Sequence, residues 1–426
     1  MNTGIFTCWR NSITNIEEMC QRAKAASIEL ARIQSETKDT ALCRMANALE
    51  ANADRILEAN QKDVEEAKAR GLKPALLDRL ALDKKKIASM AKCLQEVAGL
   101  PDPIGTIVNS WTRPNGLIIG QIRTPLGVVG VIYESRPDVT SDAAGICIKS
   151  GNAVILRGGS DAINSNVAIG EILRNALSGT KVPVDALQVV NTTDRSAAGE
   201  LMKMRDYIDV LIPRGGADLI KTVIKEASIP VIETGTGNCH IYVDEDAELD
   251  KATRIVINAK CQRPGTCNAA EKLLVHANVA ARFLPIVAGA LRAEGVEIRG
   301  DEETLKIVSG AKLATEEDWY TEYLDLIIGV KVVRSLDEAI NHINKYGTKH
   351  SESIITSSFD KALQFIKNVD SAAVYWNAST RFTDGNQFGL GAEIGISTQK
   401  IHARGPISAQ HLTTMKYFIL GKGQIR

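Results

Sequence analysis

The sequence carries no excess of charge and few aromatic side chains. Lys and Arg together number 51, and Asp and Glu also number 51, so the net charge is zero. Non-specific binding to nucleic acid or to an anionic membrane needs a strongly basic surface, so this balance argues against both kinds of partner. Aromatic residues make up 4% of the chain, whereas its 33 glycines predict many tight turns. Hydrophobic residues at 44% and charged residues at 24% are typical of folded domains, which argues against intrinsic disorder.

Long hydrophobic runs are also absent. A membrane-spanning helix needs ~20 predominantly apolar residues, whereas the strongest run, at 126–133, contains two glycines and ends at Glu134. Residues 1–21 show no basic start followed by an apolar stretch, and Glu17 and Glu18 fall where the core of a signal peptide would lie. We therefore expect a cytoplasmic protein with no membrane segment.

None of the eight cysteines belongs to a Cys-x-x-Cys pair. Zinc is the competing interpretation for cysteines in a polar loop, but zinc sites commonly use such pairs. Because His276 also lies within a strand-like segment, we predict no metal site. Five cysteines are interpreted as simple buried or surface thiols: Cys8, Cys20, Cys43, Cys93 and Cys147.

The length of 426 residues suggests two or three domains at ~150 residues each. The segment 13–99 is rich in Ala, Leu, Glu and Lys with apolar residues near helical spacing, which predicts a helical N-terminal layer. A cluster of Gly and Pro at 99–103 ends this layer. The segment 105–125, punctuated by Gly and Pro, is β-like and predicts a hairpin.

Short apolar runs then alternate with helical segments, a pattern typical of a parallel sheet buried on both faces. Helices are predicted at 163–177 and 219–227, and the pattern indicates a doubly wound α/β domain. The predicted strands are 127–133, 153–156, 187–190, 210–212 and 231–232.

A second α/β series begins near Ala252 and predicts a second domain. The tail at 401–420 returns to strand-like residues, which can pair either with the hairpin at 105–125 or with another subunit. The second series comprises a helix through Asn258, a helix at about 281–293, and strands at 272–276, near Val296, at 327–333 and at 353–356.

Two glycine-rich turns are candidates for nucleotide binding. Arg157 and the glycines at 158–159 lie between a predicted strand and a helix, where backbone N–H groups and the helix dipole favour a phosphate. The Arg157 guanidinium suits the extra phosphate of NADP. The alternative is a plain turn capped by Ser160, because the full G-x-G-x-x-G spacing is absent. A second turn, Arg214 with the glycines at 215–216, makes a nucleotide crevice on the same sheet a stronger interpretation.

Cys267 lies in the polar loop Cys261-Gln-Arg-Pro-Gly-Thr-Cys267-Asn268. A thiol in such a loop is interpreted as a nucleophile and not as core filling. A cysteine nucleophile needs a lowered pKa, which Lys260, Arg263 or a helix N-terminus can provide. Cys267 opens the run Cys-Asn-Ala-Ala-Glu, which we interpret as a possible helix start.

Two further polar stretches are candidates for ligand binding. In the run Glu233-Thr-Gly-Thr-Gly-Asn-Cys-His240 the glycines let a ligand approach the backbone. Glu233 is either a general base or nicotinamide-orienting group, or simply a cap, and His240 is expected to make a structural hydrogen bond. The loop at 377–393 can hold an amino-acid substrate through charge-assisted bonds from its Ser, Thr, Arg and Asp side chains. A solvated loop is the alternative, but its length without an apolar stripe favours a function.

Together these stretches resemble the aldehyde dehydrogenase superfamily over nearly the whole chain. The general resemblance lies in Arg123-Thr-Pro-Leu-Gly-Val-Val-Gly-Val-Ile, in the strand ending at Arg157, in Glu233-Thr-Gly and in the Cys267 loop. More specific motifs are similar to the branch that reduces an amino-acid acyl phosphate: Tyr133-Glu-Ser-Arg-Pro-Asp-Val-Thr, Glu233-Thr-Gly-Thr-Gly-Asn-Cys-His, Cys267-Asn-Ala-Ala-Glu-Lys-Leu-Leu-Val-His and Ala378-Ser-Thr-Arg-Phe-Thr-Asp-Gly.

This resemblance implies an α/β, aldehyde dehydrogenase-like fold with two doubly wound parallel-sheet domains and a small β element for oligomerisation. It divides the chain into an NADP-binding domain with its helical layer at 1–104 and 126–255, a catalytic domain at 256–399, and an oligomerisation element at 105–125 and 400–426.

The implied function is the NADPH-dependent reduction of L-glutamyl 5-phosphate to L-glutamate 5-semialdehyde with release of phosphate, the second step of proline synthesis from glutamate. In this hypothesis the Cys267 thiolate attacks the acyl carbon, a thioester forms, and hydride from NADPH reduces it. The backbone N–H of Cys267 and a neighbouring amide are the expected donors to the oxyanion, and Asn268 is assigned to the catalytic residues with Cys267.

The resemblance also assigns binding residues. Hydrolytic members carry Asn in the loop that corresponds to 134–136, whereas this chain has Ser135, so the side-chain oxyanion donor is unassigned. Glu233 matches the base that activates water in those members. Attack of water on the thioester would waste the substrate here. The cofactor is assigned to Ser135, Arg157, Gly158, Gly159, Gly215, Gly216, Glu233, Gly235 and Glu322, and the substrate to Arg136, Arg381, Thr383 and Asp384.

Other functions remain open at this point. A CoA-acylating aldehyde dehydrogenase would share the cysteine and the cofactor crevice, but Arg136 and Arg381 favour a small anionic acyl phosphate. A non-catalytic binding protein is a second alternative, against which the intact Cys267 loop argues. Unpaired strand-like edges predict a homo-oligomer, with a dimer preferred and a tetramer open. The resemblance also allows an association with the glutamate 5-kinase that makes the unstable substrate.

Overall fold

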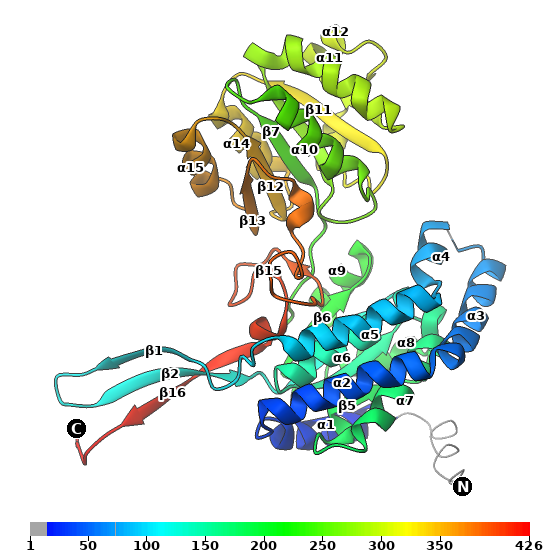
Figure 1. Cartoon of the computed structure of the whole chain (residues 1–426), viewed down its shortest axis with the longest axis vertical. Helices are drawn as coiled ribbons and strands as arrows, with labels where there is room; N and C mark the ends of the chain where they lie inside the picture. The colour runs from blue at the N-terminus through cyan, green and yellow to red at the C-terminus, as the bar shows by residue number, and fades with distance from the viewer. Residues whose placement is uncertain (1–14, 73) are drawn as a thin grey trace. The chain divides into compact units, whose positions relative to one another are not determined.

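The computed structural model describes residues 15–72 and 74–426, and the chain separates into two compact units (Figure 1). The first unit runs to Glu233 and also takes Leu390–Gly395 and Ile407–Arg426, while the second unit consists of Thr234–Gly389 and Ile396–Pro406. In the described part of the chain, no helix is long and apolar enough to cross a membrane.

The first unit begins with the expected helical layer, which is confirmed from Ile16 onward; Ile13 and Cys8 lie outside the described residues. Three of its helices bury an apolar stripe, as Leu42, Met45 and Leu49 do on the second helix. The layer comprises α1 (Ile16–Leu30), α2 (Ser35–Ala51), α3 (Ala53–Ala69), α4 (Pro74–Leu80) and α5 (Lys84–Gly99).

Two buried lysines tie this layer to the following domain. Lys149 donates to Asp39 Oδ1 at 2.5 Å and to the carbonyl of Ala98 at 2.8 Å, while Lys38 donates to the carbonyl of Lys149 at 3.0 Å and pairs with Asp102 at 2.5 Å. Because both ammonium groups are buried, these hydrogen bonds are needed to offset the cost of desolvating the charges. The helical layer is therefore joined to the sheet domain by specific polar contacts as well as by apolar packing.

The first unit contains a four-stranded parallel sheet in the order β5-β4-β3-β6, as the alternating pattern predicts. One predicted strand is wrong: 231–232 makes only an isolated bridge through Leu211 and Val231. The helix α6 was not predicted, because nearly all of its residues are buried and no polar face marks it. The elements are β3 (Val128–Tyr133), α6 (Asp138–Lys149), β4 (Ala153–Gly158), α7 (Ile163–Leu177), β5 (Leu187–Val189), α8 (Arg195–Leu201), β6 (Val210–Arg214) and α9 (Ala217–Glu226).

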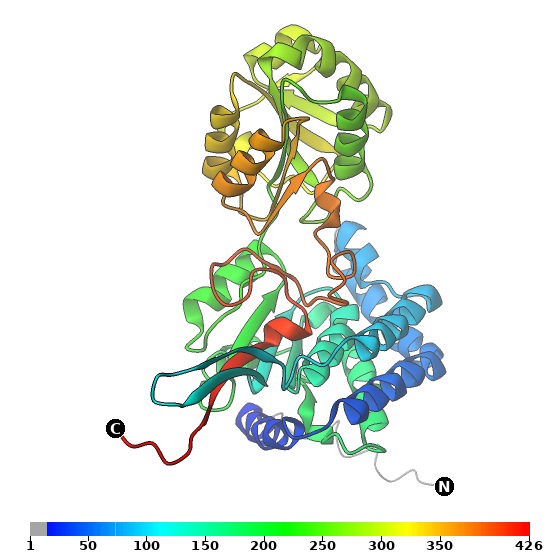
Figure 2. The same cartoon turned by 60° about the vertical axis from the view of Figure 1, so that its left-hand side comes forward.

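The hairpin at 105–125 is confirmed as β1 (Ile107–Thr112) and β2 (Ile118–Pro125), and the C-terminal tail pairs with it as β16 (Thr413–Leu420). The three strands lie side by side in Figures 1 and 2. We call this antiparallel sheet the arm. Of the two pairings left open for the tail, the structure therefore has the one with the hairpin.

The second unit contains a seven-stranded parallel sheet in the order β10-β9-β11-β8-β7-β12-β13, which confirms the second α/β series. Two separate apolar clusters cover its faces, since α10 and α11 pack on one cluster and α14 and α15 on the other. The elements are β7 (Cys239–Val243), α10 (Leu249–Cys261), β8 (Ala270–His276), α11 (Ala277–Ala293), β9 (Glu297–Gly300), α12 (Glu302–Ile307), β10 (Lys312–Leu313), α13 (Glu316–Tyr320), β11 (Ile327–Val333), α14 (Leu336–Tyr346), β12 (Ser351–Ile355), α15 (Phe359–Asn368) and β13 (Ala373–Trp376).

The division into units falls at 233/234, whereas the sequence analysis places the start of the second domain at 256. The difference is β7, which hydrogen-bonds to β8 and β12 in the middle of the second sheet. A buried strand carries no sign of which sheet it joins, so the sequence leaves this boundary unresolved.

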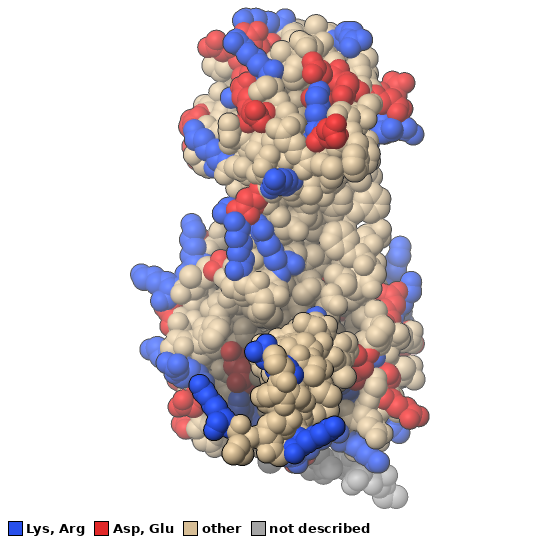
Figure 3. All heavy atoms as spheres, turned by 90° about the vertical axis from the view of Figure 1, so that its left-hand side faces the viewer, with Lys and Arg blue, Asp and Glu red and all other residues tan. Residues whose placement is uncertain are grey.

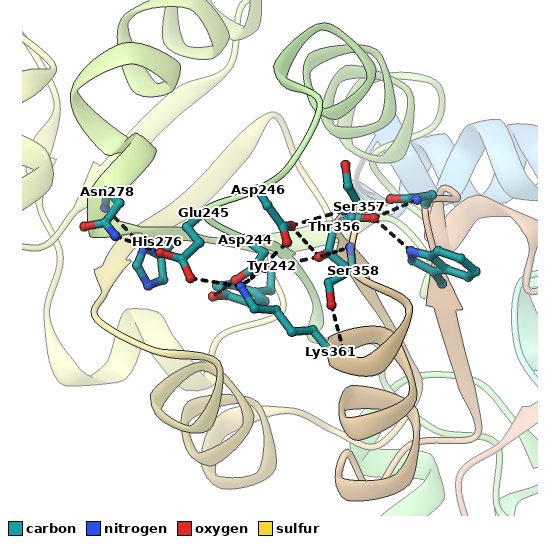
Figure 4. A network of polar contacts seen from close by, with 12 residues as sticks. Tyr242, Asp244, Glu245, Asp246, His276, Asn278, Thr356, Ser357, Ser358 and Lys361 are labelled. Carbon is teal, nitrogen blue, oxygen red and sulfur yellow. Dashed lines mark hydrogen bonds and ion pairs between the residues drawn. The ribbon is translucent and has the colours of Figure 1, made fainter.

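The carboxyl edge of the second sheet is closed by a polar network (Figure 4). Asp244 follows β7 and is buried, and it accepts hydrogen bonds from Lys361 Nζ at 2.7 Å and Tyr242 Oη at 2.8 Å. Thr356, which follows β12, donates to Asp246 at 2.6 Å. Burial alone would lower the pKa of Lys361, but its hydrogen bonds to Asp244 and Glu245 outweigh burial and raise it. The network therefore holds the ends of β7 and β12 and the start of α15 together.

Replacing Lys361 with Met should destabilise the second unit. The substitution leaves Asp244 buried without its cation, so we expect the free energy of unfolding to fall by about 2 kcal/mol. Urea denaturation followed by circular dichroism measures this change. Lys367→Met, at the exposed end of the same helix, is the matched control. An equal loss of stability in the two variants would contradict the role given to the network.

Candidate functional site

The first unit gathers its polar turns at one edge of its sheet. All four strands are parallel, so the loops that follow them lie at the same edge. From β3 the chain builds β4 and β5 on one side and then returns to place β6 on the other side of β3. The reversal between β3 and β6 is the topological switch point, where doubly wound sheets bind their ligands.

The predicted residues Arg157, Gly158 and Gly159 lie at the carboxyl end of β4 and at the start of the turn after it. The first two are the last residues of the strand, and Gly159 precedes a short 3-10 helix, Ser160–Ala162. A side chain at Gly158 would place its Cβ 1.9 Å from Asn166 Nδ2, so a larger residue here would have to displace the Asn166 side chain. The alternative of a Ser160 cap is wrong, because Gly159 occupies the cap position and no side chain bonds there.

The Arg157 side chain is buried but incompletely bonded. It is 9% exposed, and its Nη2 donates to the carbonyl of Asp194 at 3.2 Å. Its Nε has no hydrogen-bond partner among the described residues, and the same is true of the buried Nε of Arg214. Burial lowers the pKa of Arg157, an effect that the nearby Glu134 opposes. Buried guanidinium N–H groups without partners fit an anionic ligand.

The turn after β6 meets the turn after β3. Gly216 caps the N-terminus of α9, and its N–H donates to Glu134 Oε2 at 3.3 Å. A Cβ on Gly215 would lie 2.6 Å from the same oxygen, so the carboxylate packs directly on the glycine turn. Sequence analysis assigned no role to Glu134. The signal available was a carboxylate directly after the strand that flanks the switch point.

Ser135 has a backbone conformation that few non-glycine residues adopt, with φ at 48°. Its side chain is buried, and its hydroxyl donates to Asp161. A serine has only one O–H to donate, so in this structure that proton is used within the first unit and is not available to an oxyanion. Arg136 lies next to it in the same turn, ahead of α6.

Cys267 lies in a half-buried loop between α10 and β8. The interpretation of a helix start is wrong, since the residues after a short turn form β8 and not a helix. A Cβ on Gly237 would come within 1.4 Å of the Cys267 carbonyl oxygen, so only glycine allows this close contact. Cys239 donates its thiol hydrogen to the same carbonyl at 3.1 Å. The sequence pattern predicts no contact of Gly237 or Cys239 with the Cys267 loop, although the repeated glycines of the 233–240 run were a signal of close backbone packing.

Arg381 and its neighbours hold the residue next to Cys267. Arg381 Nη1 donates to Asn268 Oδ1 and, at 3.0 Å, to Thr266 Oγ1. The Asn268 side-chain amide donates to the carbonyl of Thr383 at 2.9 Å, and Thr380 Oγ1 donates to the Asn268 carbonyl at 2.7 Å. The structure therefore brings the predicted Arg381, Thr383, Asn268 and Cys267 together in the second unit.

Burial lowers the pKa of Arg381; the cation of Arg263 adds to this effect and Cys267 opposes it. Arg381 thus lies within electrostatic range of the Cys267 sulfur. Arg381 Nε also donates to Gln262 Oε1 at 3.0 Å, which fixes the guanidinium against the loop. Asp384 accepts backbone N–H bonds from Asn386 and Gln387 and so shapes its own turn.

The remaining predicted residues lie in the irregular segment 233–238 or beside it. No helix follows Glu233, so the cap interpretation is wrong. Gly235 donates its N–H to the carbonyl of Ile396 at 2.9 Å, and Glu322 Oε1 accepts the Gly237 N–H at 2.6 Å. Glu322 is thus fixed to the backbone that packs on Cys267.

The expected side-chain hydrogen bond of His240 is also wrong. His240 Nδ1 lies 3.3 Å from Glu352 Oε2, but neither buried imidazole nitrogen makes a hydrogen bond of good geometry among the described residues, and burial lowers the pKa of His240 well below its usual range. Its backbone N–H donates to Glu352 Oε2 at 2.5 Å instead. His240 is therefore a neutral residue of the sheet interior.

Comparison with known proteins gives a consistent result. Residues 2–307 match the aldehyde dehydrogenase family. The chain is 59% identical to the gamma-glutamyl phosphate reductase of Caldanaerobacter subterraneus subsp. tengcongensis over 96% of this chain and 99% of that protein. The crystal structure of gamma-glutamyl phosphate reductase from Thermotoga maritima superimposes with a TM-score of 0.94 at 51% identity, covering 97% of this chain and 100% of that one.

A more distant structure shows the fold alone. The acetylating aldehyde dehydrogenase of Geobacillus thermoglucosidasius is 18% identical and has a TM-score of 0.71, covering 96% of this chain and 97% of that one. The predicted aldehyde dehydrogenase-like α/β fold with two parallel sheets is thereby confirmed. The family match and the near full-length identity lead to one conclusion: this chain belongs to the gamma-glutamyl phosphate reductases of the aldehyde dehydrogenase family.

Proposed function

We propose that this protein reduces L-glutamyl 5-phosphate to L-glutamate 5-semialdehyde with NADPH and releases phosphate, the second step of proline synthesis from glutamate. The observation that carries the proposal is the 59% identity to a gamma-glutamyl phosphate reductase over 96% of the chain. The Cys267 loop supports it, because a half-buried thiol in a loop fixed by buried hydrogen bonds suits a nucleophile.

The residues of the first unit fit an anionic dinucleotide. Arg157 and Arg214 each have a buried N–H without a partner among the described residues, and the exposed glycines of the second turn, Gly215 and Gly216, leave the backbone accessible at the N-terminus of α9. Arg157 would take the extra phosphate of NADP. NADPH supplies a hydride when bound. The assignments of Ser135, Glu233, Gly235 and Glu322 to the cofactor remain predictions.

In the proposed mechanism the Cys267 thiolate attacks the acyl carbon of the substrate, and the bond to phosphate breaks to leave a thioester on Cys267. After reduction, the thiohemiacetal on Cys267 collapses to the aldehyde and frees the thiolate. Each tetrahedral intermediate places negative charge on the former carbonyl oxygen, and the backbone N–H groups of the Cys267 loop are the proposed donors. The side chain of Asn268 is bonded to Thr383 and Arg381, so it would orient this backbone.

Arg136 and Arg381 remain the proposed binding groups for the anionic substrate, together with Asp384 for its ammonium group. Arg381 also acts on the loop itself, since it contacts Asn268 and Thr266. Thr383 has a buried hydroxyl bonded to Ser351 at 2.6 Å and Tyr375 at 2.7 Å. This arrangement favours a role for Thr383 in supporting the loop.

We also propose that the arm joins two copies of the chain in a dimer. Every residue of β1 is exposed, and several apolar side chains of the arm are exposed as well. The side of the molecule from which the arm projects is seen in Figure 3. A three-stranded sheet gains stability by covering an apolar face, so a second copy is the partner that the arm fits. The exposed apolar side chains of the arm include Ile107, Val108, Trp111, Ile118, Met415, Tyr417, Ile419 and Leu420. The association with glutamate 5-kinase stays a prediction.

The reaction can be tested in reverse, with glutamate 5-semialdehyde, phosphate and NADP, by following NADPH absorbance. Cys267→Ala should lower the rate by about a thousandfold or more, because no other thiol can form the thioester. Cys261→Ala, at the end of the preceding helix α10 and with a pKa raised by burial, is the control and should keep its activity. Turnover without phosphate would instead indicate a hydrolytic dehydrogenase, and turnover only with CoA a CoA-acylating one.

The preference for NADP can be tested by NADPH and NADH fluorescence titrations. Arg157→Ala should weaken NADPH binding by about 10- to 100-fold, because a charge-assisted bond to the extra phosphate is lost. NADH affinity should change little. Arg205→Ala, an exposed arginine of the first unit, controls for the loss of one positive charge. Equal weakening of both cofactors would argue against Arg157 as the phosphate ligand.

Light scattering can test the dimer. The double substitution of Trp111→Asp and Ile419→Asp places charges on the exposed strands of the arm, so the mass in solution should fall from two chains to one. Ile28→Asp, at an exposed apolar position on α1, should leave the mass unchanged. A wild-type protein of one chain, or a variant that keeps its mass, would overturn the proposed interface.

A further inference from the structure

The turn after β3 places a carboxylate on the helix N-terminus that the proposed cofactor needs. We propose that Glu134 is an internal anion that occupies the start of α9 in the absence of cofactor and is displaced by a phosphate group of the dinucleotide. The inference rests on the proposed function, since it assumes that NADPH binds at the switch point. It adds a specific competitor for that binding, built into the chain.

The geometry puts Glu134 across the switch point. Its backbone N–H donates to the carbonyl of Arg214 at 3.1 Å, which continues the pairing of β3 with β6 by one residue. From there its side chain reaches the glycine turn, where Oε2 accepts the N–H of Gly216 at 3.3 Å. Gly216 is the cap of a ten-residue helix. The carboxylate thus lies where free N–H groups and the helix dipole favour an anion.

Charge balance explains why an anion is present before the cofactor binds. Arg157 is buried, and its Nε has no hydrogen-bond partner among the described residues. Burial lowers the pKa of Arg157, and the charge of Glu134 is the largest of the effects that oppose this shift. A buried cation without any nearby anion is costly. Glu134 is therefore the main anion that offsets the charge of Arg157, with Asp194 as a weaker second contributor.

The bond that Glu134 makes is suited to being broken. It is a single, long hydrogen bond, and the side chain is exposed to solvent. A charge at an exposed helix N-terminus contributes only modestly to stability. A phosphate offers several oxygens to the same N–H groups, so it can replace one carboxylate oxygen. If Glu134 stayed in place, its charge would repel the phosphate, and the side chain must therefore turn away.

Glu134→Gln tests the proposal because it predicts two changes of opposite direction. Without cofactor the variant should melt at a lower temperature than the wild type, since the helix loses its anion. The dissociation constant for NADPH, measured by fluorescence titration, should fall about two- to fivefold, because the competitor is gone. The gain should shrink as salt is added, since salt screens the repulsion.

The matched control is Glu226→Gln, which removes the same charge from the exposed last residue of the same helix. It should leave the NADPH dissociation constant unchanged. Weaker NADPH binding by Glu134→Gln would overturn the proposal and show that Glu134 is a ligand of the cofactor. Unchanged binding with unchanged melting would show that the contact with Gly216 has no energetic role. If wild-type protein fails to bind NADPH at all, the proposed function fails, and that result is distinct from either outcome.

Discussion

The parallel pairing of both sheets is the constraint on which the rest of the structure depends. In a parallel sheet the loops that follow the strands collect at one edge and those that precede them at the other. The first unit uses its carboxyl edge, where the turns after β3, β4 and β6 bring glycines and arginines together. In the second unit the carboxyl edge is closed by the network around Asp244 and Lys361, and Cys267 lies at the amino edge, ahead of β8.

The second constraint is how closely the backbone of Cys267 is held. On one side its carbonyl packs against Gly237 and accepts the Cys239 thiol, and on the other Asn268 is fixed through its side chain and its carbonyl. Such contacts set the position of the backbone N–H groups before any substrate arrives. Preorganised donors cost no reorganisation during the reaction, so a loop held in this way suits the chemistry proposed for it.

Sequence periodicity was sufficient for elements whose signal is local. The run 163–177 matches α7, and the glycine-rich turns, the hairpin and the Cys267 loop were found because their residue types mark them. The sequence alone could not show features that depend on which strands and loops pair in the folded chain. The apolar run of β7 does not show which sheet it joins, and Val231 makes a single bridge in place of a strand. The run after Cys267 resembles the start of a helix in sequence but leads into strand β8. The close contact of Gly237 with Cys267 depends on two segments far apart in the chain.

The turn at 134–136 places a carboxylate and a cation close together in a chain of zero net charge. The proposed binding of a dinucleotide and an acyl phosphate relies on the cations of Arg157, Arg214 and Arg136, and a buried cation is costly unless an anion lies near it. Glu134 lies in the same turn as Arg136 and contacts the turn after Arg214. In the proposal above, the Glu134 carboxylate balances this charge and can be displaced, because its hydrogen bond to Gly216 is long and the side chain is exposed. Local charge balance and anion binding can therefore be served by the same three-residue turn.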